Sequence, residues 1–199
     1  MNVENKIKKC SLCGDLPKLT YNSIKQGNCN ILILGESPAK DGWIQSGKAF
    51  YNAQGKLQAT GRILQKLLEI CNISIDNISF IECCKCIIED RTQLRKCIHN
   101  CQPILLEQIS KIDCDIILPM GQYPTEAVLN TKIKRLKDYI GKIFPIKIYN
   151  KLKVVIPIYH TSPANPLGYK GNVAIFEKLK DYFKLRENIT ITPSEDKIK

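Results

Sequence analysis

Residues 30–39 read N-I-L-I-L-G-E-S-P-A, a short apolar run that ends in glycine and passes directly into a polar loop. An apolar run of this length bounded by turn residues is typical of a strand that is buried on both faces. We therefore predict a strand at residues 30–35. Similar runs predict three further strands, at residues 77–83, 114–121 and 153–160.

Segments with helical periodicity separate these strands. They predict helices at residues 60–70, with Thr60 as the N-cap, at 92–110, at about 125–129 and at 173–185. Pro103 predicts a break or a new first turn inside the second helix. We expect the basic stretch at residues 132–137 to be solvated surface.

The alternation of strands and helices predicts the fold class, which is α/β. We expect a single-domain three-layer sandwich with a central, mostly parallel four-stranded sheet flanked by helices. The domain would cover residues 1–187 and include an N-terminal metal-binding arm. The polar residues 188–199 would form a flexible tail.

Polar residues follow three of the predicted strands. They are the loop at residues 35–43, Glu82 at the end of the second strand, and His160 with the loop at residues 161–172. In an open α/β sheet, ligands bind outside the carboxyl ends of the strands. We therefore expect these polar residues to converge on one site.

The overall charge favours a polyanionic partner. The chain has 30 Lys and Arg residues against 19 Asp and Glu residues, a formal net charge of +11, and each neutralised phosphate releases counterions. Charge alone does not establish a nucleic-acid function. No apolar run approaches the roughly 20 residues that span a bilayer, so we expect no membrane association.

Four of the ten cysteines have positions that suit one metal centre. Cys10 and Cys13 form a C-x-x-C pair, and Cys86 and Cys101 follow much later in the chain. A soft tetrathiolate site binds zinc or an iron-sulfur cluster, and the residues alone leave both open. The first residues lack the apolar core of a signal peptide, so we expect a reducing cytoplasm rather than a disulfide framework. Cys29, Cys71 and Cys114 are expected to be small buried hydrophobic residues.

Six short motifs, taken in order, resemble the uracil-DNA glycosylase superfamily, and within it the family 4 enzymes that carry an iron-sulfur cluster. The resemblance covers roughly residues 10–185. The motifs are C-x-x-C at 10–13, G-E-S-P-A at 35–39, G-K-A-F at 47–50, E-C-C-K-C at 82–86, C-Q-P-I-L at 101–105 and H-T-S-P at 160–163.

This resemblance implies a cofactor and a partner. The cofactor would be a 4Fe-4S cluster on Cys10, Cys13, Cys86 and Cys101, with zinc as the less favoured alternative. Three further cysteines, Cys83, Cys84 and Cys97, would be spare thiols near it. The partner would be DNA containing uracil or another deaminated base, bound by a monomer in the cytoplasm.

The resemblance also implies roles for individual residues. The uracil would lie on Phe50, with the loop of Gly35, Ser37, Pro38 and Ala39 near its carbonyl oxygens. Glu36 would stabilise the positive charge on the sugar and His160 would donate to the base O2. Asp41 is the second candidate for positioning water. The residues expected to contact DNA are Ser162, Pro163, Asn165 and Lys170.

Two residues depart from the family pattern. Glu82 stands where the family has an asparagine that reads the base edge, and an ionised glutamate only accepts hydrogen bonds. A base with an exocyclic amine would suit an ionised Glu82 better than uracil does. Ala39 replaces the usual glycine of the first motif. Two alternatives therefore stay open: a nucleic-acid-binding iron-sulfur protein with little turnover, and a glycosylase for a different damaged base.

Overall fold

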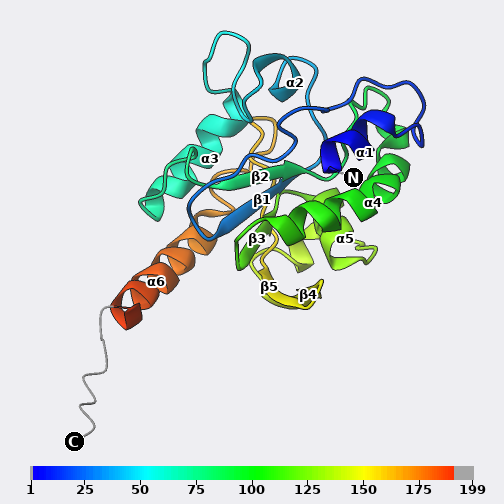
Figure 1. Ribbon diagram of the computed structural model, residues 1–199. Helices are drawn as coiled ribbons and strands as arrows, with labels where there is room; N and C mark the ends of the chain where they lie inside the picture. The colour runs from blue at the N-terminus through cyan, green and yellow to red at the C-terminus, as the bar shows by residue number, and fades with distance from the viewer. Residues whose placement is uncertain (1, 191–199) are drawn as a thin grey trace, which may run out of the picture.

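Strand β1, Ile31–Gly35, lies between two parallel neighbours in the central sheet. The structure is a computed structural model that describes residues 2–190, with side chains as far as residue 185. The sheet has five strands in the order β2-β1-β3-β5-β4 (Figure 1). The other strands are β2 Ser79–Glu82, β3 Ile116–Pro119, β4 Phe144–Ile148 and β5 Lys151–Val155. The first four strands in the order are parallel, and β4 is antiparallel to β5. The predicted α/β class and mostly parallel sheet are confirmed.

Helices connect the strands and cover both faces of the sheet. They are α1 Val3–Lys9, α2 Trp43–Ser46, α3 Ala59–Ile70, α4 Leu94–Lys111, α5 Gln122–Leu129 and α6 Val173–Thr190, with short 3₁₀ helices η1 Arg91–Gln93 and η2 Leu136–Asp138. No helix of residues 2–190 has both the length and the apolar character needed to cross a bilayer.

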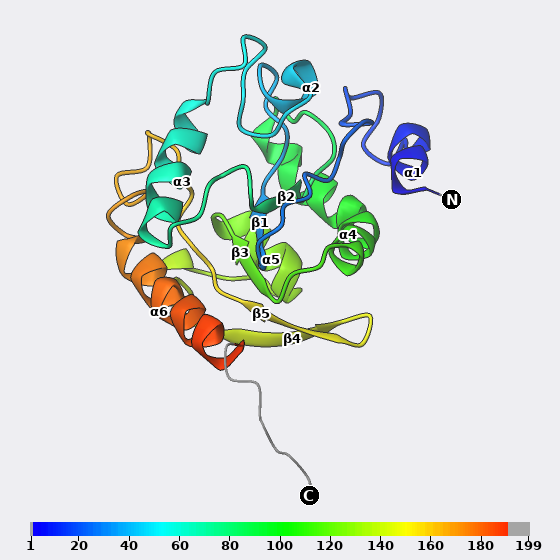
Figure 2. The same ribbon diagram turned by 60° about the vertical axis from the view of Figure 1, so that its left-hand side comes forward.

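The alternation of side chains along each strand divides the core into two layers. Ile31 and Ile33 of β1 belong to the cluster that also contains Leu64 and Phe176, from α3 and α6. Leu32 and Leu34 point the other way, toward residues of α4 and α5. Figure 2 shows the sheet between α3 and α6 on one side and α4 on the other. Burial of both faces explains why β1 is apolar at every position.

The prediction of a four-stranded sheet is wrong by one strand, because it did not include β4. Pro145 lies within β4, and a proline is typical of edge strands. The two-residue turn to β5 consists of Tyr149 and Asn150, both with positive φ, and it lacks the glycine that usually marks such a turn. The predicted strand at 153–160 is shorter as β5, although Ile158 still bridges to Met120 beside β3.

Three helix predictions also need correction. Helix α3 begins at Ala59 with Gln58 as its N-cap, so Thr60 lies inside the first turn. Helix α4 is continuous through Pro103, because apolar residues on both sides of the proline pack on the sheet. Helix α6 runs to Thr190, so residues 188–190 of the predicted tail are helical, and residues 191–199 lie outside the described residues.

Candidate active site

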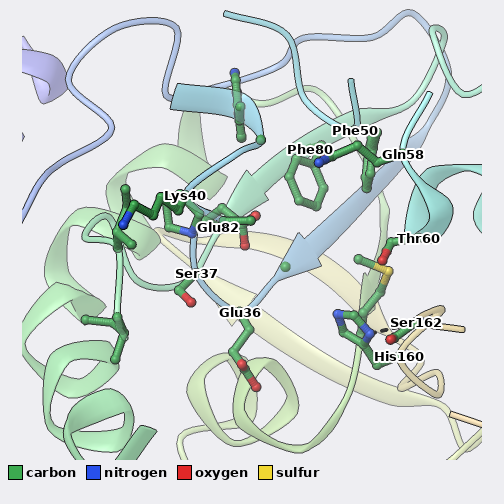
Figure 3. Close-up of a pocket in the computed structure, with 18 of the residues that line it drawn as sticks. Glu36, Ser37, Lys40, Phe50, Gln58, Thr60, Phe80, Glu82, His160 and Ser162 are labelled. Carbon is green, nitrogen blue, oxygen red and sulfur yellow. Dashed lines mark hydrogen bonds between the residues drawn. The ribbon is translucent and has the colours of Figure 1, made fainter. Parts of the chain in front are cut away.

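The candidate site lies at the carboxyl end of the sheet, on the face that α3 and α6 cover. Side chains two residues apart on a strand share a face, so Gly35 follows Ile33, Glu82 follows Phe80, and His160 follows Ile158 on this side. These three strand ends line one cavity with a volume of about 570 Å³. The predicted convergence of Glu36, Phe50 and His160 is present, because all three line this cavity (Figure 3).

Aromatic rings form one wall of the cavity. The ring centroids of Phe50 and Phe80 lie 4.3 Å apart at an interplanar angle of 50°, and those of Trp43 and Phe80 lie 5.4 Å apart. Phe50 has a φ of 69°, a conformation that is strained for a bulky residue. Helix α3 can approach Phe50 because Gly61 has no side chain: a Cβ atom there would lie 2.9 Å from Phe50 Cβ. The packing therefore holds this ring in one place.

His160 has a defined tautomer. The backbone N–H of Ser162 donates to His160 Nδ1 over 3.1 Å, so Nδ1 is unprotonated and Nε2 carries the hydrogen. Burial lowers the pKa of His160, Glu36 opposes this shift, and Arg91 adds to it. The side chain of Asn165 donates to the His160 carbonyl over 2.9 Å, which fixes the backbone of the loop. His160 is therefore a neutral hydrogen-bond donor at ordinary pH.

Glu36 forms an ion pair across the cavity. Its Oε1 lies 2.5 Å from Nη1 of Arg91, which belongs to η1 and has a side chain that is 61% exposed. The pairing raises the pKa of Arg91. The arginine was not predicted from the sequence, although it lines the cavity. It holds the glutamate carboxylate in a defined position.

Glu82 is the most unusual residue of the site. It is paired with Gly35 in the sheet, is only 8% exposed, and its Oε2 has no hydrogen-bond partner among the described residues. Burial raises the pKa of Glu82 to about 8, which Lys85 partly opposes and Glu36 reinforces. A Cβ atom on Gly35 would lie 2.2 Å from Glu82 Oε2, so this glycine makes room for the carboxyl group.

The structure brings together most of the remaining predicted residues of the first loop, but not all. Ser37, Pro38 and Ala39 line the cavity beside Gly35. Asp41 does not reach it: the residue is exposed and lies against a separate hollow on the far side of Gln58. The position of Asp41 therefore gives no support to the predicted role in positioning water.

The predicted DNA-contact residues lie on the loop that follows His160. Ser162 lines the cavity, whereas Pro163 and Lys170 are exposed beyond it. Asn165 lies in the same loop, but its side-chain amide is used within the protein, on the His160 carbonyl. The buried side chain of Asn172 binds the backbone of Tyr159 from the base of the loop.

Three of the four predicted cluster cysteines lie in one group of thiols. Cys86 is hydrogen-bonded to Cys13 and to Cys84, and Cys84 is also hydrogen-bonded to Cys101. The hydrogen bonds with Cys84 lower the pKa of both Cys86 and Cys101, which favours the thiolate form that binds metals.

Two further observations concern this group. Cys10 is half-buried at the C-terminal end of α1, and no described contact joins its thiol to the others. In residues 2–190, no group of three or more His, Cys, Asp or Glu side chains has the arrangement of a metal-ion site. The donor chemistry of Cys13, Cys86 and Cys101 fits a thiolate-bound group, and the place of the fourth ligand stays a prediction.

Several residues of the site were not predicted from the sequence. Phe80 could have been found, because it lies two residues before Glu82 on a strand and so shares its face. Arg91 and Gln58 carry no such signal. They reach the cavity from η1 and from the N-cap of α3, and their approach depends on the three-dimensional fold.

Comparison with known proteins identifies a family for this chain. No curated protein sequence matches the chain. The family model described as Uracil DNA glycosylase superfamily matches residues 22–184, which include every strand of the sheet and every residue that lines the cavity. Cys10 and Cys13 precede the matched residues. Because the match covers most of the chain and agrees with a cavity at the carboxyl ends of the strands, the chain belongs to the uracil-DNA glycosylase superfamily and has the general role of a DNA-repair glycosylase.

Proposed function

We propose that this protein removes uracil, or a related deaminated base, from DNA by hydrolysing the N-glycosidic bond and leaving an abasic site. The observation that carries the proposal is the position of Glu36, Phe50 and His160 around one cavity. The base must leave the helical stack to reach such a cavity, because its reacting bond is inaccessible within a duplex.

The chemistry requires opposite charges to be stabilised at two ends of one bond. As the bond between the sugar C1′ and the base nitrogen breaks, its electron pair moves to the base and positive charge develops on the sugar. The Nε2–H of neutral His160 would donate to the base O2, where negative charge accumulates. The Glu36 carboxylate would stabilise the sugar cation while a water oxygen bonds to C1′. The proton that this water loses balances the proton that the departing base anion takes up.

The aromatic wall would hold the base during this step. The extruded base would stack on Phe50, whose ring is in contact with that of Phe80. The loop after His160 would enter the DNA, with Ser162 and Pro163 near the vacated position and Lys170 at a phosphate. The net charge of +11 supports binding to a polyanion. We propose that one copy of the chain acts alone, in the cytoplasm.

We also propose that the thiol group binds a 4Fe-4S cluster through Cys10, Cys13, Cys86 and Cys101. The lowered pKa values of Cys86 and Cys101 support the assignment, because thiolates are the ligands of such clusters. A cluster bound by these cysteines would cross-link the N-terminal arm to α4. Zinc is the alternative metal for this set of ligands.

The proposal is tested by incubating the protein with labelled single- and double-stranded oligonucleotides that carry uracil, hypoxanthine or xanthine, followed by alkali to cleave abasic sites. We expect strand cleavage at uracil by the wild-type protein and loss of cleavage in the Glu36→Gln variant. Glu69→Gln on α3 is the matched control and should cleave as the wild type does. Binding to these oligonucleotides without cleavage of any base would support the rival, a DNA-binding protein without turnover.

A further inference from the structure

The carboxyl group of Glu82 is built into the cavity as an isolated polar group. It closes strand β2, lies beside Gly35 in the sheet and is more than nine-tenths buried. Its Oε2 has no hydrogen-bond partner among the described residues, and Figure 3 shows the carboxyl group directed into the space between Phe80 and Glu36. A polar atom with this placement is available to a ligand.

The charged groups around Glu82 do not form an ion pair with it in the part of the chain that the structure describes. Lys85 is 1% exposed and lies next to it, but its Nζ donates to the backbone carbonyl of Glu82 rather than to the carboxyl group. Lys40 pairs with Glu89 at the surface. The remaining neighbours are Glu36, which pairs with Arg91, and the Cys83 thiol and His160, both of which are neutral.

A buried carboxyl group without a cation is disfavoured in its charged form. Transfer of an unpaired charge out of water is costly, and such a group responds by taking up a proton. For Glu82 this effect of burial is larger than the opposing effect of the nearby Lys85. The like charge of Glu36 acts in the same direction. The positions of these groups therefore favour the neutral acid.

We propose that Glu82 reads the base as a neutral carboxylic acid, donating its O–H to a ring carbonyl and accepting from the adjacent ring N–H. This inference rests on the proposed function and deepens it. An ionised carboxylate only accepts, whereas the neutral acid offers one donor and one acceptor side by side, as an amide does. The bases that it fits present a C=O next to an N–H, as uracil, hypoxanthine and xanthine do.

The test compares the wild type with Glu82→Gln and with the matched control Glu177→Gln on the exposed face of α6. Single-turnover excision of uracil is measured across pH. We expect excision by the wild type and by the control to fall about tenfold for each pH unit above the pKa of Glu82, which is about 8. Glu82→Gln should keep its activity there, because its amide has the same donor and acceptor and does not titrate.

A second measurement does not depend on activity. The folded protein holds a proton on Glu82 that the unfolded chain releases at its ordinary pKa, so this residue makes the fold less stable as pH rises from 4.5 to about 8. The melting temperature of the wild type should therefore fall relative to that of Glu82→Gln across this range. Glu177→Gln should follow the wild type.

The outcomes separate this inference from the proposed function. The neutral-acid assignment is overturned if excision by the wild type stays constant or rises through pH 8. It is also overturned if the difference in melting temperature between the wild type and Glu82→Gln does not change with pH. Either result leaves the proposed glycosylase function in place. If none of the three proteins excises any base, both the proposed function and the role of Glu82 in recognising the base are overturned. In that case the melting temperatures still show whether the carboxyl group is neutral.

Discussion

The backbone N–H of Ser162 donates to Nδ1 of His160, two residues earlier in the same loop, over 3.1 Å. This bond leaves Nε2–H as the donor that the cavity presents. We predict that His160→Ala lowers the single-turnover excision rate by about 10²–10³-fold, the usual effect of removing one donor to a developing negative charge. The only other histidine, His99, is exposed on α4 and supplies the control. Equal loss in His99→Ala would contradict this role for His160.

The acid limb of the pH profile follows from the same residue. Burial lowers the pKa of His160 below its ordinary value of 6.5. Protonation would place a hydrogen on Nδ1, where the Ser162 N–H already points, so the residue works in its neutral form. We expect excision to stay constant as pH falls through 6.5 and to decline only at lower pH. A decline centred at or above 6.5 would contradict the assignment.

Gly35→Ala tests the close approach of β1 and β2. The new Cβ atom would lie 2.2 Å from Glu82 Oε2 and 2.7 Å from Phe80 Cζ, so both side chains must move. We predict a fall in kcat/KM for uracil excision of at least about tenfold, or about 1.4 kcal/mol. The free energy of unfolding should fall by about 1–3 kcal/mol, as for other overpacked sites. Unchanged kcat/KM would show that the position of Glu82 is not critical.

Arg91→Ala tests the ion pair with Glu36. Because the arginine side chain is largely exposed, we expect the free energy of unfolding to change by less than about 1 kcal/mol. The fall in the rate of excision, expressed as a free energy, should be larger than this change in stability, because the Glu36 carboxylate loses the group that positions it. Arg135, which pairs with Asp138 on the surface at 2.8 Å, provides the matched control variant Arg135→Ala.

Cys101→Ser tests the proposed cluster. We expect loss of iron and of broad visible absorption, together with a lower melting temperature, because a bound cluster would join α4 to the N-terminal arm. Cys29→Ser, at the opposite end of β1, should retain iron. Colourless wild-type protein that contains zinc would refute the iron-sulfur assignment.

Much of the fold could be predicted because strand burial leaves a strong signal. Every position of β1, β2 and β3 is buried, and β1 and β3 end in glycine and proline respectively. Strand β4 has only one fully buried residue, Ile148, and contains a proline, so its signal was too weak. Edge strands bury less surface than central strands do, and their sequences are correspondingly less restricted.

Without the family resemblance, which supplied Phe50, the site could be predicted only at the ends of the strands. Glu36, Glu82 and His160 come directly after apolar runs, and the fold brings parallel strand ends together. Arg91 begins the short 3₁₀ helix η1 and Asp41 lies in a turn, and in both places the direction of a side chain depends on contacts with the rest of the protein. The arginine reaches the cavity and the aspartate does not, and local sequence does not distinguish them.

Each outer border of the sheet carries a feature that limits strand addition. On β2, the backbone of Phe80 exchanges two hydrogen bonds with Lys25, at 2.8 and 2.9 Å. On β4, Pro145 is opposite Val154, whose N–H donates to Asp115 beside β3, so the proline nitrogen faces outward and has no hydrogen to offer. A second copy therefore finds the ladder interrupted at Phe80 on one border and at Pro145 on the other. Crowding of many copies along DNA should be less prone to fibre-like aggregation through this sheet than it would be with two uninterrupted borders.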